Sequence, residues 1–312
     1  MPCLPALFVE RLKHIIPVSQ YESVLATFAG ARAFAFRVNT LKMNSADTSR
    51  ILETLGVSAS FHPALPDVFI VPAVARDQIR ELEYFSDGRW YWQAPSSLLP
   101  ALVLAPGAGE SVLDLCAAPG SKTTQMAALV GPQGAITAVE VIKGRFFKLK
   151  SVCALTGVTN VKCLLTDGRR FRPPPELFAK VLVDAPCSSE GRFDINNKKS
   201  FGFWSPHKIK EMAHKQKGLL LNAGRCVKDG GVLVYSTCTF APEENETVVD
   251  WFLKKTKGEF ILEAFDLPGV PRYPALQSYE RREYAADLSA CWRVLPDGVF
   301  SGFFMARLRK KL

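Results

Sequence analysis

The chain has 312 residues, 48% of them apolar, and its 39 basic and 30 acidic residues give a net charge of +9 at pH 7. That length is enough for one large domain or two smaller ones, and the apolar content excludes a wholly disordered chain. A net positive charge favours a polyanionic partner, although a basic enzyme that binds no nucleic acid has the same balance.

No segment predicts membrane insertion or secretion. The longest apolar stretch, residues 98–105, is interrupted by Pro100, is followed by Pro106, and is too short to span a bilayer. The first residues, Met1-Pro2-Cys3-Leu4, lack the charged and apolar regions of a secretory signal. We therefore expect no membrane partner and a cytoplasmic protein, or a nucleolar or mitochondrial one if its source is eukaryotic.

Eight cysteines are present, and no two of them form a Cys-x-x-Cys pair. The four histidines show no ligand spacing beside them, so the sequence disfavours a zinc site and predicts no metal. Without a secretory signal, the thiols are expected to be reduced. The cysteines are Cys3, Cys116, Cys153, Cys163, Cys187, Cys226, Cys238 and Cys291.

Residues 1–92 predict a small unit of mixed α and β structure. Apolar residues recur at helical spacing in one segment and alternate with polar residues in another. No low-complexity linker follows, so we expect this unit to pack against residues 93–312. The predicted elements are a helix over 4–16, a strand over 34–40, and a helix that Ser45 caps and Gly56 ends.

After Pro106, strand and helix patterns alternate along the chain. Short apolar runs predict buried strands, and amphipathic segments between them predict helices. This alternation is typical of an α/β fold, with a largely parallel sheet covered by helices on both faces. The predicted strands are 112–115, 135–141, 161–165, 180–184 and 232–235; the helices are 122–129, 143–155, 206–227 and 243–254; and 292–295 with 302–308 form a hairpin.

Two cysteines each follow a predicted strand. Cys187 ends the run Asp-Ala-Pro-Cys and Cys238 ends the run Ser-Thr-Cys. Strand carboxyl ends are where an open α/β sheet places its chemistry, and a thiol there can act as a nucleophile. A pair of such thiols favours covalent catalysis with assisted release. A small buried apolar side chain is the simpler interpretation of the remaining thiols, which are Cys116, Cys153, Cys163, Cys226 and Cys291.

Small residues form the turn after the first strand of the predicted sheet, from Cys116 to Gly120. Such residues let a ligand approach the backbone closely. About twenty residues later, Glu140 ends the second strand, where a carboxylate can accept hydrogen bonds from two ribose hydroxyls. Asp167 follows the third strand and can face an adenine edge.

The turn lacks the Gly-x-Gly-x-x-Gly pattern of a dinucleotide site, and Ser121 interrupts the Gly-Lys pair of a phosphate-binding Walker loop. A ligand with ribose and adenine but no pyrophosphate fits better, which favours S-adenosylmethionine. A plain tight turn with structural Asp114 and Glu140 is the alternative.

Residues 192–217 contain seven basic and two acidic residues, with aromatic residues between them. This combination suits phosphate contacts and base stacking, and Phe193, Phe203 and Trp204 are candidates for the wall of a base pocket. Ordinary packing is the alternative for the aromatic residues, and a solvated helix face is the alternative for Lys208–Lys217.

Three longer segments of the chain stand out, and they are DLCAAPGSKT (114–123), DAPCSSEG (184–191) and STCTFAPEENE (236–246). In this order they resemble the Nol1/Nop2/Sun family of RNA 5-methylcytosine methyltransferases, and 36–41, 93–97 and 302–307 are similar to further family segments. The resemblance covers nearly the whole chain and implies a Rossmann-like class I methyltransferase domain over 93–312, with a doubly wound sheet of seven strands. It also implies that the smaller α+β domain over 1–92 binds RNA.

The resemblance implies that Cys238 is the nucleophile on C6 of cytosine, that Cys187 assists its release, and that Asp184 binds the N3/N4 edge of the base. A thiolate at C6 delivers electron density to C5, which can then take a methyl group. Lys122 is a candidate source of positive charge for the thiolate. The candidate cofactor-binding residues are Cys116, Ala117, Ala118, Pro119, Gly120, Lys122, Glu140, Arg145, Asp167, Gly168 and Asp184.

The expected function is methyl transfer from S-adenosylmethionine to C5 of a cytidine in RNA by a monomer, with ribosomal RNA as first choice and transfer RNA as second. A non-catalytic RNA-binding ribosome assembly factor that retains the fold is the alternative, and a redox enzyme is a third interpretation that the lack of Cys-x-x-Cys disfavours. The acids of segment 242–246 are expected to stabilise a helix amino terminus, with shaping of the active-site loop as the alternative.

Overall fold

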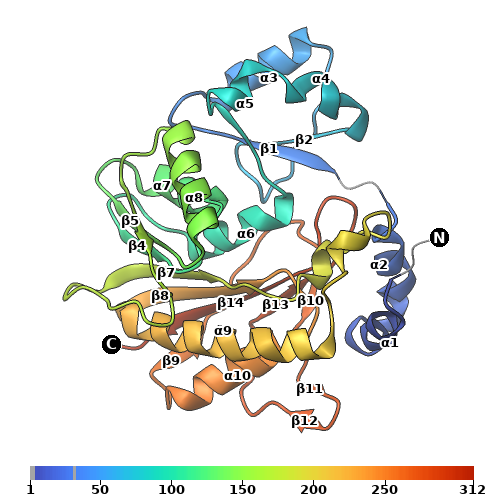
Figure 1. Cartoon of the computed structure of the whole chain (residues 1–312), viewed down its shortest axis with the longest axis vertical. Helices are drawn as coiled ribbons and strands as arrows, with labels where there is room; N and C mark the ends of the chain where they lie inside the picture. The colour runs from blue at the N-terminus through green and yellow to red at the C-terminus, as the bar shows by residue number, and fades with distance from the viewer. Residues whose placement is uncertain (1–3, 31–32) are drawn as a thin grey trace.

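A computed structural model describes residues 4–30 and 33–312 (Figure 1); Cys3 lies outside these ranges. A large sheet lies between two layers of helices, and a smaller unit that contains a second sheet packs above one layer (Figure 1). Among the described residues, no helix has the length and apolarity needed to cross a membrane.

The large sheet has nine strands in the described part of the chain, in the order β10-β13-β14-β8-β7-β4-β5-β6, with β9 paired to β14. The five strands from β4 to β8 run parallel, and β14 is antiparallel to β8. The predicted hairpin is confirmed as β13 and β14. The bounds are β4 Ser111–Asp114, β5 Ala135–Glu140, β6 Val161–Leu165, β7 Phe178–Asp184, β8 Val227–Thr237, β9 Phe260–Leu262, β10 Arg272–Pro274, β13 Trp292–Val294 and β14 Phe303–Lys310.

The predicted count of seven strands is therefore too low for this sheet. Seven strands do follow one another as β6-β5-β4-β7-β8-β14-β13; the three-residue strand β10 is added beyond β13, and the three-residue strand β9 pairs with the end of β14. Runs of three residues do not carry a readable alternation of apolar and polar positions, which is why the sequence pattern misses them.

Successive residues of the inner strands bury opposite faces of the sheet. Val232 and Val234 of β8 pack with the helices of one layer, whereas Leu233 and Tyr235 pack with those of the other. This follows from the two-residue period of a strand and explains why the strands read as continuous apolar runs. One layer holds α6 Pro95–Leu104, α7 Ser121–Val130 and α8 Lys143–Thr156; the other holds α9 Pro206–Cys226 and α10 Glu246–Lys255 (Figure 1).

The smaller sheet has its own apolar core. Strand β1 pairs antiparallel with both β2 and β3, and Phe36 stacks on Phe69 and Trp90 with ring centroids 5.4 and 4.5 Å apart. The helix predicted to be capped by Ser45 is instead capped by Asn44, which accepts a hydrogen bond from the Asp47 N–H. The elements are β1 Phe34–Val38, α3 Ser45–Thr54, β2 Val68–Val71, α4 Arg76–Arg80, α5 Glu83–Ser86 and β3 Trp90–Trp92.

Hydrogen bonds join the smaller sheet to helices α7 and α8 beside the large sheet. The buried Arg37 guanidinium donates to Gln93 Oε1 and Thr124 Oγ1, and Asn39 Nδ2 donates to the Thr156 carbonyl at 2.7 Å. Each contact satisfies a polar group that would otherwise be buried alone, so the two units are held in one relative position.

The first two helices pack on the large sheet rather than on the small one. Phe8 of α1 (Ala6–Ile15) contacts Phe28, Phe193 and Trp204, with centroids 4.8 to 5.9 Å apart. The chain therefore covers the core of residues 93–312 before it builds the smaller sheet. The remaining elements are α2 Tyr21–Thr27, the two-stranded sheet β11 Ser278–Tyr279 and β12 Arg282–Glu283, and the 3₁₀ helices η1 Val18–Gln20, η2 Ala73–Ala75, η3 Glu190–Arg192 and η4 Lys198–Ser200.

Candidate active site

A cavity of about 560 Å³ lies at the carboxyl ends of β4, β7 and β8. Residues of both units line the cavity, because Tyr91 and Trp92 of the smaller sheet lie in its wall together with loops of the large sheet. Eight of the predicted site residues line it, and they are Cys116, Ala118, Pro119, Lys122, Arg145, Asp184, Cys187 and Cys238.

The two predicted catalytic thiols meet in this cavity. Cys187 and Cys238 follow β7 and β8, which are neighbouring parallel strands with Asp184 opposite Ser236, and their Sγ atoms are 3.2 Å apart. The loops after the two strands are joined directly, since the Gly191 N–H donates to the Cys238 carbonyl at 3.0 Å. The register of the sheet thus positions both sulfurs.

The two sulfurs differ in acidity. The hydrogen bond with the Cys187 thiol stabilises the thiolate of Cys238 and lowers its pKa to about 7, whereas the same contact together with burial raises the pKa of Cys187. Of the two thiols, Cys238 is therefore the one that loses its proton first as the pH rises. A thiolate is the nucleophilic form of cysteine, so Cys238 is the sulfur prepared for attack.

Two cationic side chains, Arg192 and Lys122, lie near the pair of thiols. The Arg192 guanidinium also lowers the pKa of Cys238, and Arg192 lines the cavity. Lys122 Nζ, the cation expected near the thiolate, lies 2.8 Å from Asp184 Oδ2 and donates to Ser97 Oγ at 2.8 Å. Lys122 is thus engaged by Asp184, and its effect on the thiol stays a prediction.

Asp184 is the carboxylate at the end of β7. Its Oδ1 accepts a hydrogen bond from Ser236 Oγ at 2.8 Å, and its Oδ2 pairs with Lys122. Both oxygens are oriented by neighbours, yet the side chain remains partly accessible from the cavity. An oriented carboxylate beside a nucleophilic sulfur can hold the polar edge of a bound base.

The turn after β4 forms another wall of the cavity. Gly120 has a φ of +111°, in the left-handed region that favours glycine, and a Cβ there would press on Leu149 and Val152 at 3.1 to 3.3 Å. Arg145 donates to the Ala118 carbonyl at 2.5 Å and holds the turn from the side of α8. Ala117 and Gly120 belong to the same turn but do not line the cavity.

Glu140 ends β5 beside this turn. Its Oε1 accepts from the N–H groups of Val141 and Ile142 at 2.9 and 2.8 Å, and its Oε2 lies 3.5 Å from Arg145. The backbone contacts orient the carboxylate, and among the described residues the contact of Oε2 is the 3.5 Å ion pair with Arg145. One carboxylate oxygen therefore remains able to accept from a ligand.

Asp114 ends β4 and is buried beside this turn. Its Oδ2 accepts from Thr123 Oγ1 at 2.7 Å, and its Oδ1 has no side-chain partner in the described part of the chain. Burial raises the pKa of this carboxyl to about 6, and the Thr123 hydroxyl and the Cys116 backbone oppose that shift. Asp114 does not line the cavity, so its contacts hold the turn in place.

Two more predicted cofactor residues, like Glu140, do not line the cavity. The Asp167 carboxylate is held by Arg169 at 2.6 Å. Gly168 is packed against Leu115 and Leu219, and its carbonyl accepts from Asn222. Both follow β6, two strands away from β4, so a ligand would have to extend along the strand ends to reach them.

The predicted aromatic wall is wrong. Phe193 is fully buried against Phe8, Trp204 donates to Glu190 Oε1 at 2.8 Å, and Phe203 is 90% exposed. None of the three lines the cavity; Tyr91 and Trp92 do. The sequence pattern could not show that α1, nearly two hundred residues earlier, packs on this segment.

Two buried acids near the thiols were missed or misassigned. Glu244 accepts from the Ser188 N–H at 3.0 Å and from Gln216 Nε2 at 2.7 Å, and burial raises its pKa to about 8. Glu190 accepts from Thr239 Oγ1 at 2.9 Å. These contacts join the loop after Cys187 to the loop after Cys238, and their only signal in the sequence is an acid beside each cysteine.

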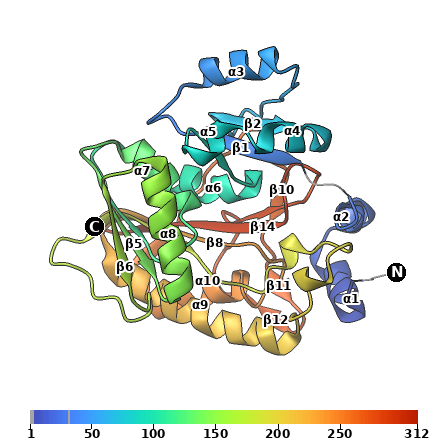
Figure 2. The same ribbon diagram turned by 45° about the horizontal axis from the view of Figure 1, so that its top comes forward.

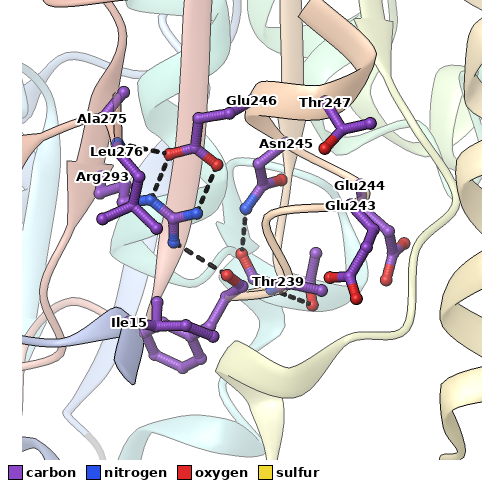
Figure 3. A network of polar contacts seen from close by, with 12 residues as sticks. Ile15, Thr239, Glu243, Glu244, Asn245, Glu246, Thr247, Ala275, Leu276 and Arg293 are labelled. Atoms are coloured by element: carbon purple, nitrogen blue, oxygen red, sulfur yellow. Dashed lines mark hydrogen bonds and ion pairs between the residues drawn. The ribbon is translucent and has the colours of Figure 1, made fainter. Parts of the chain in front are cut away.

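The acids after Cys238 were predicted to stabilise a helix amino terminus, but their main contacts are different. Helix α10 begins at Glu246, whose carboxylate forms a buried ion pair with Arg293, and Asn245 Nδ2 donates to the Thr239 carbonyl (Figure 3). Glu243 instead pairs with Arg11 of α1 at 2.8 Å. The alternative, that this segment shapes the active-site loop, agrees with these contacts.

Ser189 is a further residue that the motifs did not single out. It adopts a φ of +61°, which is uncommon for a residue other than glycine. Its Oγ lies 3.6 Å from Cys238 Sγ and 3.9 Å from Cys187 Sγ. The unusual backbone conformation thus brings a hydroxyl beside both sulfurs.

The strand order and the site at the strand carboxyl ends are those of a class I methyltransferase, here with two thiols in its cavity. The chain belongs to the family described as 16S rRNA methyltransferase RsmB/F, whose model matches residues 101–309. The predicted family and the predicted enzyme class, an RNA methyltransferase, are therefore confirmed.

Similar proteins span most of the chain. A tRNA (cytosine(49)-C(5))-methyltransferase of Pyrococcus abyssi is 36% identical over 280 residues, 88% of each chain. Ribosomal RNA small subunit methyltransferase F of Pectobacterium carotovorum is 35% identical and covers 98% of this chain, which spans 63% of that protein's length. The crystal structure of a methyltransferase homolog from Pyrococcus horikoshii is 29% identical, with a TM-score of 0.83 over 98% of this chain and 95% of that one.

Proposed function

We propose that this protein transfers a methyl group from S-adenosylmethionine to C5 of a cytidine in RNA, through a covalent bond between Cys238 and C6. The observation that carries the proposal is the thiol pair, with sulfurs 3.2 Å apart and the lower pKa on Cys238. Membership of an rRNA methyltransferase family supports the same reaction.

The residues on the β4 and β5 side fit S-adenosylmethionine. The Glu140 carboxylate suits the two ribose hydroxyls, and the turn from Cys116 to Gly120 suits close approach of the ligand. When bound, the cofactor supplies an electrophilic methyl group for carbon C5.

The thiols perform the covalent part of the reaction. The Cys238 sulfur forms a bond to C6, and electron density from the C5–C6 double bond becomes available at C5. After methylation, C5 loses its proton to a base, the double bond forms again, and the C6–S bond breaks with its electron pair returning to sulfur. Cys187, a thiol of raised pKa in hydrogen-bond contact with that sulfur, can supply a proton to it as it leaves.

Asp184 assists by holding the base. Its carboxylate lies at the end of the strand before Cys187 and is oriented by Ser236 and Lys122. A hydrogen bond to the N3/N4 edge of cytosine would orient C6 toward Cys238 and stabilise the charge that develops on the ring. The base has to leave its stack to reach this cavity, which is easier in single-stranded or looped RNA.

The proposed substrate is ribosomal RNA first and transfer RNA second, because the family description and the relatives' names include both classes. We further propose that residues 1–92, the predicted RNA-binding domain, contact the RNA, since Tyr91 and Trp92 extend the cavity wall from this part of the chain. Reduced thiols at the site suit a reducing compartment such as the cytoplasm.

The test is incubation of the protein with methyl-labelled S-adenosylmethionine and purified rRNA or tRNA. We expect label in 5-methylcytosine, none with Cys238→Ala, and normal labelling with the control Cys163→Ala, a half-buried thiol outside the cavity. Cys187→Ala is expected to accumulate a protein–RNA adduct on denaturing gels at pH 8.5, where a large fraction of Cys238 is ionised even without its hydrogen bond to Cys187. RNA that binds without ever taking label would support an assembly factor instead.

A further inference from the structure

Positive charge is concentrated in one segment of the chain. Residues 141–172 contain eight basic residues and one acidic residue, so this segment alone carries +7 of the net +9 of the whole protein. It comprises α8, β6 and the residues just after β6, at one edge of the large sheet (Figure 2). The basic residues are Lys143, Arg145, Lys148, Lys150, Lys162, Arg169, Arg170 and Arg172.

Helix α8 presents a basic and aromatic surface to solvent. Lys143, Phe147 and Lys150 follow one another at spacings of four and three residues, so they lie along one stripe of the helix, and all three are exposed. Phe147 is 53% exposed, while Leu149 and Val152 on the opposite side are buried. We call the residues Lys143, Phe147, Lys148 and Lys150 the α8 face.

The lysines of the α8 face are free to bind another molecule. Within residues 4–30 and 33–312, none of the three forms an ion pair, and α8 contains no acidic residue. Helix α9 is different, because Glu211 pairs with both Lys208 and Lys215 there. Three unpaired cations around an exposed ring do not stabilise the fold and are the usual composition of a single-strand binding surface.

The α8 face is continuous with the active site. Arg145, one turn into the same helix, lines the cavity and contacts both Glu140 and the Ala118 carbonyl. A strand that leaves the cavity past Arg145 would therefore meet Lys143 and then the rest of α8. Charge complementarity with a phosphate backbone selects RNA as the occupant, given that the proposed substrate is RNA.

We propose that the α8 face binds the single-stranded segment of the substrate RNA that adjoins the target cytidine. Its lysines contact phosphates, and Phe147 stacks on a base. This inference rests on the proposed function for the identity of the polymer but not for its chemistry, because binding does not require methyl transfer.

The test measures binding of a fluorescein-labelled single-stranded RNA 12-mer by anisotropy, without cofactor, from 50 to 300 mM salt. The triple variant Lys143→Glu/Lys148→Glu/Lys150→Glu is expected to bind at least tenfold more weakly and to reduce the slope of log K against log salt by about 2, since each phosphate contact contributes about 0.7. The control Lys228→Glu/Lys255→Glu/Lys257→Glu changes the net charge equally at exposed positions elsewhere and should retain the wild-type slope.

The aromatic contribution has its own variants. Phe147→Leu keeps apolar bulk but removes the stacking ring, and Phe147→Ala removes both. Both are expected to bind about five- to tenfold more weakly with an unchanged salt slope, because stacking involves no counterion release. Affinity equal to wild type in both would contradict stacking by Phe147.

The outcomes separate this inference from the proposed function. Equal affinity and slope in the α8 triple variant and its control would overturn the inference even if RNA is methylated. Loss of affinity and slope in the triple variant alone would support it even if no methyl group is ever transferred. A triple variant that retains RNA binding but loses a protein partner would also overturn it.

Discussion

The thiol side and the cofactor side of the cavity are built in different ways. On the β4–β5 side, the wall is a turn of small residues whose backbone is exposed to the ligand, with Glu140 oriented by two N–H groups. On the β7–β8 side, buried acids hold two loops together through side chains, as Glu244 does with Ser188 and Glu190 with Thr239. The first side depends on local conformation, whereas the second depends on contacts between distant segments.

This difference predicts where substitutions cause unfolding and where they change only binding. On the thiol side, removal of one buried charge leaves its partner buried and unpaired, which destabilises the whole domain. On the cofactor side, removal of a side chain that points to a ligand affects that ligand first.

The largest effect is expected for the ion pair behind the thiol loop. Glu246→Ala should lower the free energy of unfolding by about 3–5 kcal/mol, because Arg293 would remain buried without its partner. Urea denaturation followed by tryptophan fluorescence measures this. Glu263→Ala is the matched control, since its partners Arg307 and Arg309 are partly exposed and about 1 kcal/mol or less is expected. Equal losses in both variants would contradict the comparison.

On the cofactor side, Glu140→Ala should raise the KM for S-adenosylmethionine by about 10- to 100-fold, since a hydrogen bond to a charged group contributes about 1.5–3 kcal/mol. The pH dependence of Cys238 alkylation should not change, because Glu140 does not touch the thiols. Steady-state kinetics and iodoacetamide labelling followed by mass spectrometry measure the two quantities. If Glu140→Ala altered the pH dependence of Cys238 alkylation and left the KM for S-adenosylmethionine unchanged, Glu140 would belong to the thiol side and not to the cofactor side.

The pH dependence of Cys238 alkylation tests whether the Cys187 thiol lowers the pKa of Cys238. Alkylation of wild-type Cys238 should rise with pH through a midpoint near 7, because the thiolate reacts and its pKa is about 7. In Cys187→Ala the hydrogen bond is lost, so the midpoint should move up toward about 8.5, the value of an ordinary thiol, and alkylation at pH 7 should slow about tenfold. Cys163→Ala should keep the wild-type midpoint, and a Cys187→Ala midpoint at 7 would exclude the pairing.

The smallest effect concerns Ser189. Ser189→Gly relieves the left-handed backbone and removes the hydroxyl, whereas Ser189→Ala removes the hydroxyl and keeps the conformation. If the hydroxyl assists the thiolate, both variants should move the alkylation midpoint of Cys238 upward and slow the reaction about two- to threefold. A change in Ser189→Gly alone would show that the backbone conformation matters and the hydroxyl does not.

The sequence predicted the features that depend on local pattern. The apolar run of β8 and the small residues after β4 are visible within a few residues, so the parallel sheet and the cofactor turn followed from them. Both thiols were also predicted, because each lies directly after a strand and the strand register places them together.

The rest depended on contacts that no local pattern contains. Arg11 and Glu243 are 232 residues apart, and the burial of Phe193 requires α1 to fold over it. The acids beside the cysteines resembled helix-stabilising residues because exposed and buried acids have the same sequence signature. Only the three-dimensional arrangement shows that Glu190 and Glu244 face inward.

The ion pair between Arg11 and Glu243 has a practical consequence for shortened versions of this enzyme. A truncation that starts at β1 would retain each strand of both sheets in the described chain, yet it would uncover Phe193 and leave the loop of Cys238 without its outer support. Such a fragment could look well folded by circular dichroism while its nucleophile is misaligned. Secondary-structure content alone is therefore a poor criterion when variants of this protein are trimmed for crystallisation.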